Sequence, residues 1–266
     1  MKQTIIENTE IRVSRFALGT ASFHHLFSSK KRQKLLEAAA SVGITHFDTS
    51  PYYGYGLAET DLGMFLSGQR SAFTVTTKVG LYPLGPASSR MVSVWVLKAF
   101  GKLVPTVSLP VVNWQVNRAR ASLHQSLKRL KTDWVDFVLL HEPVQTLINA
   151  DEFMRWIEAE HARGTVRSWG LAGVANSVAP WLLTGHPLAR VIQTQDSLDK
   201  RQADFMLSSD RCLQFTYGYL SSQPQADQAI DPELTLRNAL ARNVTGSVIV
   251  ATRRADRIAK LARLAA

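Results

Sequence analysis

The sequence predicts an α/β fold, a single (β/α)8 TIM barrel in which each of eight parallel strands is followed by a helix. The first observation is a regular alternation of short β-branched runs and amphipathic segments, which we count as eight strand–helix pairs. The second is a length of 266 residues with 45% hydrophobic content, enough to bury one large core. No linker interrupts the alternation, so we expect residues 1–266 to form one domain.

A small N-terminal β-hairpin is expected first, at residues 4–13, with its turn near Glu7, Asn8 and Thr9. Strands and helices then alternate through the first half of the chain. The expected strands here are residues 15–19, 45–48, 73–78 and 134–141, and the expected helices are residues 31–42, 58–66, 116–130 and 151–163. The run WVDFVLLH in the fourth strand is almost continuously apolar, which is typical of a strand covered on both faces.

The second half of the chain repeats this alternation. Its expected strands are residues 166–171, 190–193, 213–217 and 247–250, and its expected helices are residues 178–184, 201–207, 232–241 and 256–264. The exception to the pattern is residues 79–113, a long loop after strand 3 of about 35 residues without clear periodicity. Ordinary strand-to-helix connections are much shorter. The loop is either a lid or substrate-binding segment at the barrel mouth or a poorly ordered surface insertion, and the sequence leaves both open.

The composition restricts the partners and the compartment. The formal charge of +10 attracts anions of every kind, but the basic residues are scattered and lack the interleaved aromatics of a nucleic-acid surface. The most apolar stretch, residues 91–114, is interrupted by lysines and prolines and falls short of a membrane-spanning helix. The only cysteine is Cys212, and the N-terminus lacks the apolar core of a signal peptide. We therefore expect a cytoplasmic protein that binds neither nucleic acid nor a membrane.

The residues that could carry chemistry follow successive strands. Asp48 ends the second strand, and Tyr53 lies in the Pro- and Gly-rich loop after it. Lys78 ends the third strand and His141 ends the fourth. The carboxyl ends of barrel strands meet at one mouth, where barrel enzymes keep their chemistry. Each residue alone has a structural explanation, as a turn acid, a loop anchor, a solvated lysine or a hydrogen-bonded histidine, but the set favours one shared active site.

These four side chains suit proton transfer to a carbonyl oxygen. A free tyrosine has a pKa of about 10 and is a poor proton donor at neutral pH. A neighbouring ammonium group stabilises phenolate, so we expect Lys78 to lower the pKa of Tyr53 and Asp48 to keep Lys78 charged. His141 would orient the carbonyl group through a hydrogen bond. No nucleophile and no metal ion is needed, which indicates a reaction whose electrons come from a bound cofactor.

The segment DTSPYYGYGLAE at residues 48–59 resembles the signature of the aldo-keto reductases. RFALGTASF before it and TTKVG, SLKRLKTDWVDFVLLHEP, GTVRSWGL and SVIVATRRADRI after it are similar to family segments in the same order, from about residue 11 to residue 264. The resemblance implies a (β/α)8 barrel that binds a nicotinamide dinucleotide across its mouth without a Rossmann fold, and the sequence has no G-x-G-x-x-G motif. It also implies a catalytic tetrad, consisting of Asp48, Tyr53, Lys78 and His141.

The resemblance further implies contacts to the cofactor. Gln193 matches the glutamine that touches the nicotinamide carboxamide, and Phe215 falls where an aromatic side chain stacks on the nicotinamide ring. The positions that resemble a binding site for the adenosine 2′-phosphate are Thr252 and Arg257, with Arg253 and Arg254 alongside. Guanidinium groups near a helix N-terminus suit a dianion, although a solvated basic helix start has the same composition.

Three departures from the family pattern bear on the cofactor and the substrate. The usual Ser-Asn pair after the fifth strand reads Ala172-Gly173, which removes two side-chain partners of the carboxamide, and nearby Asn176 is a candidate substitute. Lys260 and Leu261 replace the acidic residue and the asparagine near the adenine. The sequence also ends at residue 266 without the C-terminal helix and loop that commonly close the substrate pocket, so we expect a less enclosed substrate.

We therefore predict an NAD(P)H-dependent oxidoreductase that interconverts a carbonyl and an alcohol, with Tyr53 as the proton donor. NADPH is favoured because three arginines and Thr252 exceed what NADH requires, and NADH remains possible. PYYGYGLAE also resembles the family branch that oxidises sugars or pyridoxal with NAD. Two other classes stay open: a dinucleotide-binding sensor or partner protein with little turnover, and an isomerase or hydrolase using Asp48, His141 and Glu142. The substrate, the reaction direction and the oligomeric state are not predicted.

Overall fold

The computed structural model describes residues 1–84, 110–221 and 231–265. Eight parallel strands pair side by side, in the order of the chain, and close into a barrel. β12 pairs with β3, with Val248 opposite Phe16, and this pairing closes the ring. The predicted (β/α)8 barrel is confirmed. Its strands are β3 (Phe16–Gly19), β4 (His46–Asp48), β5 (Thr74–Val79), β8 (Val135–His141), β9 (Val166–Gly173), β10 (Val191–Gln195), β11 (Phe215–Tyr217) and β12 (Ser247–Val250).

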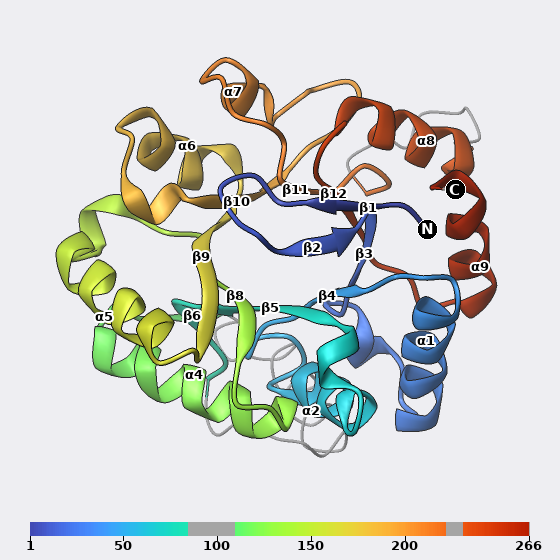
Figure 1. Cartoon of the computed structure of the whole chain (residues 1–266), viewed down its shortest axis with the longest axis horizontal. Coiled ribbons are helices and arrows are strands. Elements are labelled where there is room, and N and C mark those ends of the chain that lie inside the picture. Colours follow the sequence, from blue (N-terminus) through green and yellow to red (C-terminus); the bar gives the residue numbers. More distant parts are fainter. Residues whose placement is uncertain (85–109, 222–230, 266) are drawn as a thin grey trace, which may run out of the picture.

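A helix follows each barrel strand, and the helices surround the strands on the outside (Figure 1). They are α1 (Ser29–Ser41), α2 (Leu57–Leu66), α4 (Val116–Leu130), α5 (Ala150–Ala162), α6 (Ala175–Leu183), α7 (Asp204–Leu207), α8 (Pro232–Arg242) and α9 (Ala255–Leu264). Asn149 caps α5 and Asp231 caps α8, since each side chain accepts a hydrogen bond from a first-turn amide. α7 is shorter than the predicted helix at 201–207, because Arg201 has a left-handed backbone (φ 49°) that a helix cannot contain.

The predicted N-terminal hairpin covers one end of the barrel. Its strands are β1 (Gln3–Ile5) and β2 (Arg12–Ser14), which pair antiparallel. In Figure 1 the hairpin crosses the barrel on the side facing the viewer. Ile6, Ile11 and Val13 from this segment are buried, and they belong to the same apolar cluster as residues inside the barrel. The hairpin therefore closes this end, and a ligand can enter the barrel only from the other.

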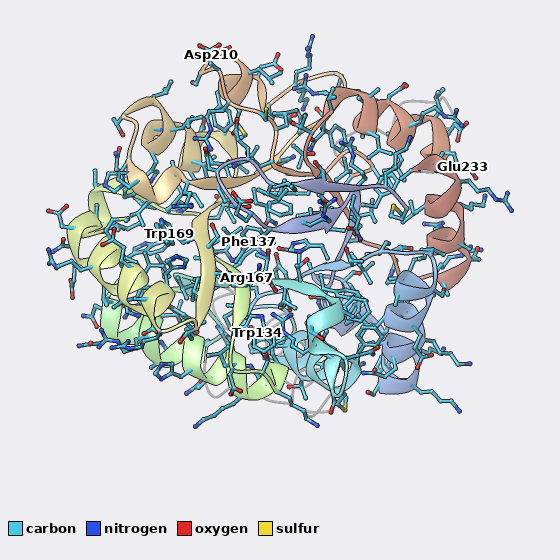
Figure 2. The ribbon with its side chains drawn as sticks, viewed as in Figure 1. Trp134, Phe137, Arg167, Trp169, Asp210 and Glu233 are labelled. Atoms are coloured by element: carbon cyan, nitrogen blue, oxygen red, sulfur yellow. The ribbon has the colours of Figure 1, made fainter. Side chains whose placement is uncertain are left out.

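The interior of the barrel holds a stack of rings. His46 lies over Phe215 with ring centroids 4.9 Å apart, and Phe137 meets Phe215 edge-on at 5.3 Å. Figure 2 shows Phe137 near the centre of the ring of strands. The two ring nitrogens of His46 contact the hydroxyls of Thr74 and Thr76 at 2.8 and 3.1 Å. Burial, with the nearby charge of Lys78 and then of Arg70, lowers the pKa of His46 to about 3, so this histidine is neutral at pH 7.

A buried ion pair links the helix after the Tyr53 loop to its neighbours. Glu59 on α2 accepts hydrogen bonds from Arg129 Nε on α4 at 2.7 Å and from Thr77 Oγ1 on β5 at 2.6 Å. The Glu59 side chain is fully buried, and these two partners satisfy its carboxylate oxygens. This arrangement ties α2 and the loop before it to the strand that carries Lys78.

The predicted long loop after β5 begins and ends in a short antiparallel pair. β6 (Leu81–Tyr82) pairs with β7 (Val111–Val112), and Gly80 lies against the ring of Trp114 in a left-handed conformation (φ 107°). The rest of the predicted lid or insertion, residues 85–109, lies outside the described residues. At the other side of the barrel the chain ends meet, since Lys2 N donates to Ala265 O at 2.7 Å (Figure 1). None of the helices in the described ranges is long and apolar enough to cross a membrane.

Candidate active site

A cavity of about 370 Å³ opens at the carboxyl ends of the barrel strands, opposite the hairpin. Every one of the predicted tetrad side chains lines it, so the structure brings the four together as the strand ends predicted. The remaining wall comes from the later strands and their loops, and it includes Ala172, Gly173, Gln193, Tyr217 and Ala251. Figure 1 shows the barrel from the opposite, hairpin-covered end.

Lys78 is the centre of the hydrogen-bond network in this cavity. Its Nζ donates to Asp48 Oδ1 at 2.6 Å, to Thr49 O at 3.0 Å and to Tyr53 OH at 3.2 Å. The lysine side chain is only 1% exposed, so its three donors are directed by protein groups rather than by water. Burial lowers the pKa of Lys78 and raises that of Asp48, and the attraction between their charges opposes both shifts. The geometry fixes an ammonium group beside the phenol oxygen.

Tyr53 is placed by a tight loop between β4 and α2. Its backbone N–H donates to Ser50 O at 3.0 Å, and Gly54, Tyr55 and Gly56 after it all have left-handed backbones. Glycine adopts this conformation at low cost, which explains the two glycines that flank Tyr55. The loop therefore turns back sharply after Tyr53 and leaves the phenol directed at Lys78.

The expected lowering of the Tyr53 pKa is not what the structure gives. Burial chiefly, and then the charges of Asp48 and Glu142, raise the pKa of Tyr53 well above its ordinary value. Burial disfavours the charged phenolate, and the two nearby carboxylates disfavour it further. Tyr53 is therefore protonated at neutral pH, which is the state that a proton donor requires.

His141, at the end of β8, meets Tyr53 edge-on with ring centroids 6.1 Å apart. Burial, and then the charge of Lys78, lower the pKa of His141 to about 3, so the imidazole is neutral at pH 7. Its Nδ1 is buried and has no hydrogen-bond partner within the described part of the chain. A neutral imidazole that lines a cavity can donate one hydrogen bond to a ligand oxygen without bringing a charge.

Gln193, on β10, offers the cavity a hydrogen-bond acceptor that is unpaired within the described residues. The side chain is 4% exposed and hydrogen-bonds with Asp48, yet its Oε1 finds no partner among residues 1–84, 110–221 and 231–265. A buried amide oxygen without a partner costs about 1–3 kcal/mol. An acceptor of this kind fits the N–H groups of a carboxamide, so the residues present fit the nicotinamide end of a dinucleotide.

The predicted ring partner Phe215 does not reach the cavity. It is buried in the barrel interior, where it stacks on His46. Tyr217, two residues later on β11, lines the cavity instead. Both side chains point inward because a strand alternates with a period of two, and the residue at the strand's carboxyl end lies nearest the mouth. The sequence predicts that this strand ends at residue 217, and that strand end is the sequence signal for Tyr217 as a residue of the cavity wall.

Of the four predicted phosphate-binding residues, Thr252, Arg253 and Arg254 lie between β12 and α9, next to the cavity residue Ala251, and Arg257 lies in the first turn of α9. Arg253 and Arg257 are exposed. Arg254 differs from them, since its guanidinium pairs with Asp256 at 2.6 Å, while its backbone N–H donates to Thr252 Oγ1 at 3.2 Å. Arg254 is therefore already partly neutralised.

Glu142 lies beside Ala172 and Gly173, where the family's usual Ser-Asn pair is absent. The sequence suggests a role for Glu142 only in the isomerase or hydrolase alternative. The carboxylate of Glu142 lies against Gly173 and accepts a hydrogen bond from Ser177 Oγ at 2.6 Å. Asn176, the expected substitute, is exposed on α6 and is not among the residues that line the cavity. The strand-end position of Glu142, directly after His141, was the only sequence signal for it.

The family model described as aldo/keto reductase family matches residues 15–195, and the chain belongs to that family. A D-threo-aldose 1-dehydrogenase of a Pseudomonas species is 32% identical over 165 residues, which cover 59% of this chain and 49% of that one. The chain thus spans about half the length of this curated relative.

Solved structures of the same family share the fold. An aldo-keto reductase from Bacillus halodurans, solved in its holo form, superposes with a TM-score of 0.76 at 19% identity. The superposition covers 99% of this chain and 90% of the Bacillus chain. An aldo-keto reductase from Klebsiella pneumoniae, solved in complex with NADPH, gives a TM-score of 0.68 at 18% identity. That superposition covers 99% of this chain and 89% of the Klebsiella chain. These likenesses confirm the barrel along almost the whole chain.

Proposed function

We propose that this chain is an NAD(P)H-dependent oxidoreductase that interconverts a carbonyl compound and the corresponding alcohol. The observation that carries the proposal is the position of Lys78 Nζ, 2.6 Å from Asp48 and 3.2 Å from the hydroxyl of Tyr53, in a cavity that His141 and Gln193 also line. This arrangement provides a protonated phenol, a fixed cation beside it and a neutral hydrogen-bond donor. Membership in the aldo/keto reductase family supports the same reaction.

Each member of the tetrad has a role that follows from its surroundings. A bound nicotinamide dinucleotide supplies the hydride for carbonyl reduction. Neutral His141 donates a hydrogen bond to the carbonyl oxygen and orients it. Tyr53 keeps its proton until that oxygen becomes an alkoxide, and then transfers it. Lys78 stabilises the phenolate that remains, while Asp48 holds Lys78 in place. In the oxidative direction Tyr53 accepts the proton instead.

The cofactor would be held by residues at both ends of the cavity. Gln193 Oε1 offers an acceptor to the carboxamide, and Tyr217, rather than Phe215, offers a ring to the nicotinamide. Thr252, Arg253 and Arg257, with Arg254 as a weaker contributor, would bind the 2′-phosphate of NADPH. The Klebsiella relative solved with NADPH supports this preference, and NADH remains the alternative.

Turnover by Tyr53→Phe tests the proton-donor assignment. Removing the hydroxyl should reduce carbonyl reduction by about a thousandfold while leaving the affinity for NADPH nearly unchanged, because the phenol acts on the reacting oxygen. Tyr82→Phe is the matched control, since Tyr82 is buried but lies outside the cavity. Activity of Tyr53→Phe within a few-fold of the wild type would show that another group donates the proton.

A second candidate is oxidation of a sugar, or of pyridoxal, with NAD as the acceptor. The likeness to D-threo-aldose 1-dehydrogenase favours it, and the same tetrad would operate in the reverse direction. Reduction of NAD during incubation with aldoses, without carbonyl reduction by NADPH, would distinguish this candidate. A third is a sensor or partner protein, motivated by the bare wall at Ala172 and Gly173. Tight dinucleotide binding without turnover in either direction would identify it.

The proposal extends to the setting in which the protein works. We expect a small carbonyl or alcohol as the partner, without nucleic acid or membrane, because the basic residues are scattered and lack interleaved aromatics. The single cysteine supports a reducing, cytoplasmic compartment. That residues 1–266 form one domain likewise remains a prediction.

A further inference from the structure

Glu142 occupies an unusual position directly after His141 on β8. Its backbone is left-handed (φ 53°), a conformation that few residues other than glycine adopt. Its N–H donates to Ala172 O at 2.7 Å, so the end of β8 is bonded to the end of β9. Unfavourable backbone conformations of this kind persist where the surroundings hold them in place. The left-handed turn directs the Glu142 side chain to the segment that follows β9.

The carboxylate of Glu142 fixes the start of α6. Its Oε2 accepts hydrogen bonds from Val174 N at 3.2 Å and from Ser177 Oγ at 2.6 Å. Val174 is the N-cap residue of α6, and its own side chain makes no capping hydrogen bond. A carboxylate at a helix N-terminus interacts favourably with the free N–H groups and the helix dipole. Glu142 therefore bonds the N-cap residue and the first turn of α6 to the end of β8.

The same carboxylate explains the glycine at position 173. A Cβ on Gly173 would lie 2.6 Å from Glu142 Oε2 and 3.0 Å from Glu142 Cδ. The φ of Gly173 is outside the left-handed region, so its backbone would accept other residues. A side chain here would displace the carboxylate, and it would also meet Ser177 Cβ at 3.2 Å. Glu142 and Gly173 are a matched pair.

One member of this pair, Gly173, lines the cavity. Gly173 and Ala172 line it together with His141, while Glu142 lies behind Gly173. The charge of Glu142 also reaches the cavity: after burial, it is the largest cause of the raised pKa of Tyr217. Movement of the Glu142 side chain would therefore shift the wall of the cavity and change the field within it.

We propose that Glu142 is a positioning residue, which holds the wall at Ala172 and Gly173 against the nicotinamide end of the dinucleotide in place of the side chains absent there. It acts through the backbone of Gly173 and Val174 and does not contact the substrate. The inference rests on the proposed function, because it assigns the nicotinamide to the end of the cavity that holds Tyr53 and His141.

The pairing is tested by melting temperatures of Glu142→Ala, Gly173→Ala and the double variant. Gly173→Ala alone should lower the melting temperature by about 3 °C, because the new methyl group meets the carboxylate. The same change in the Glu142→Ala background should cost less than about 1 °C, since the two closest contacts are then removed and Ser177 Cβ at 3.2 Å is the nearest atom left. Glu37→Ala, on the exposed face of α1, is the control for loss of a glutamate. Equal costs of Gly173→Ala in both backgrounds would overturn the pairing.

The positioning role is tested by titrating the same variants with two ligands. Glu142→Ala should weaken NADPH about tenfold, because a misplaced wall disturbs the nicotinamide. It should leave adenosine 2′,5′-bisphosphate, which has no nicotinamide, within about twofold of the wild type. Glu142→Gln should bind NADPH within about threefold of the wild type, since its amide oxygen can accept the same two hydrogen bonds.

The outcomes separate this inference from the proposed function. A wild-type protein that binds neither NADPH nor NADH contradicts the proposed function and the inference together. Normal NADPH binding by Glu142→Ala contradicts the inference alone. Equal weakening of NADPH and of the bisphosphate also contradicts it, because Glu142 would then support the barrel in general rather than the nicotinamide end.

Discussion

The β4–β5 side of the barrel mouth differs from the β9–β12 side in how its polar groups are satisfied. On the first side, Lys78 donates to three protein oxygens within 3.2 Å and is almost fully buried. On the second side, Gln193 Oε1 has no partner in the described ranges, and the wall at Gly173 has no side chain. A self-contained network suits chemistry that must stay fixed, whereas open acceptors suit a ligand that completes them.

Breaking the network on the β4–β5 side should have the largest effect. Lys78→Met should reduce turnover by about a thousandfold and destabilise the fold by about 3 kcal/mol, since it leaves Asp48 buried without its cation. The double variant Lys78→Met/Asp48→Leu should recover most of the stability and none of the turnover. Urea unfolding and steady-state kinetics separate these effects. A double variant no more stable than the single one would mean that Asp48 does not depend on Lys78.

Lowering the pH should destabilise the fold through His46, which lies in the barrel interior. The pKa of His46 is lowered to about 3, so between pH 6.5 and 3 the unfolded chain binds a proton that the folded chain cannot. The stability that this group contributes is complete above about pH 6.5 and is lost as the pH falls, by about 1.4 kcal/mol per unit. His46→Gln should therefore reduce the pH dependence of urea unfolding by about one proton. Exposed His124→Gln is the control, and equal slopes for both variants would refute the assignment.

Tyr217 and Phe215, on the same strand β11, should affect different properties: Tyr217 dinucleotide binding and Phe215 the stability of the fold. Tyr217→Ala should weaken dinucleotide binding about tenfold, because it removes a ring that lines the cavity. Phe215→Leu should leave binding unchanged and cost about 1 kcal/mol of stability, since it alters the packing on His46. Fluorescence titration and thermal melting measure both. The opposite division would restore Phe215 as the partner of the nicotinamide ring.

The smallest expected effects concern the arginines at the start of α9. Arg257→Ala should weaken NADPH about tenfold and leave NADH unchanged, because only NADPH carries the 2′-phosphate. Arg254→Ala should weaken NADPH by less than about threefold, since that guanidinium already pairs with Asp256. Equal losses for NADPH and NADH in Arg257→Ala would show that Arg257 does not contact this phosphate.

The sequence was sufficient for the barrel and for the gathering of the tetrad, and the reason is physical. Strand ends can be located from hydrophobic periodicity, and the topology of a parallel barrel brings those ends to one mouth. This logic holds for Asp48, Lys78 and His141, whose positions depend only on where β4, β5 and β8 end. The same logic places Tyr217, at the end of β11, in the cavity wall, and Phe215 in the barrel interior.

Other features depend on contacts between distant segments, which no local pattern contains. The pKa of Tyr53 is raised by burial first and then by the charges of Asp48 and Glu142, so the expected lowering was wrong. The role of Glu142 follows from a left-handed turn and from the approach of α6. Arg254 pairs with Asp256, so one of the three arginines expected at the phosphate site already has an acidic partner. Each of these three features depends on how charged groups are arranged in the folded structure.

We expect the β9–β12 side of the mouth to hold a nicotinamide dinucleotide despite its bare wall. The direct measurement is a paired titration of the wild-type protein with NADPH and NADH, followed through quenching of its six tryptophans. We predict saturable binding of both, with NADPH tighter by about tenfold because of its 2′-phosphate. Binding of neither dinucleotide would contradict the account and leave the tetrad without a source of hydride.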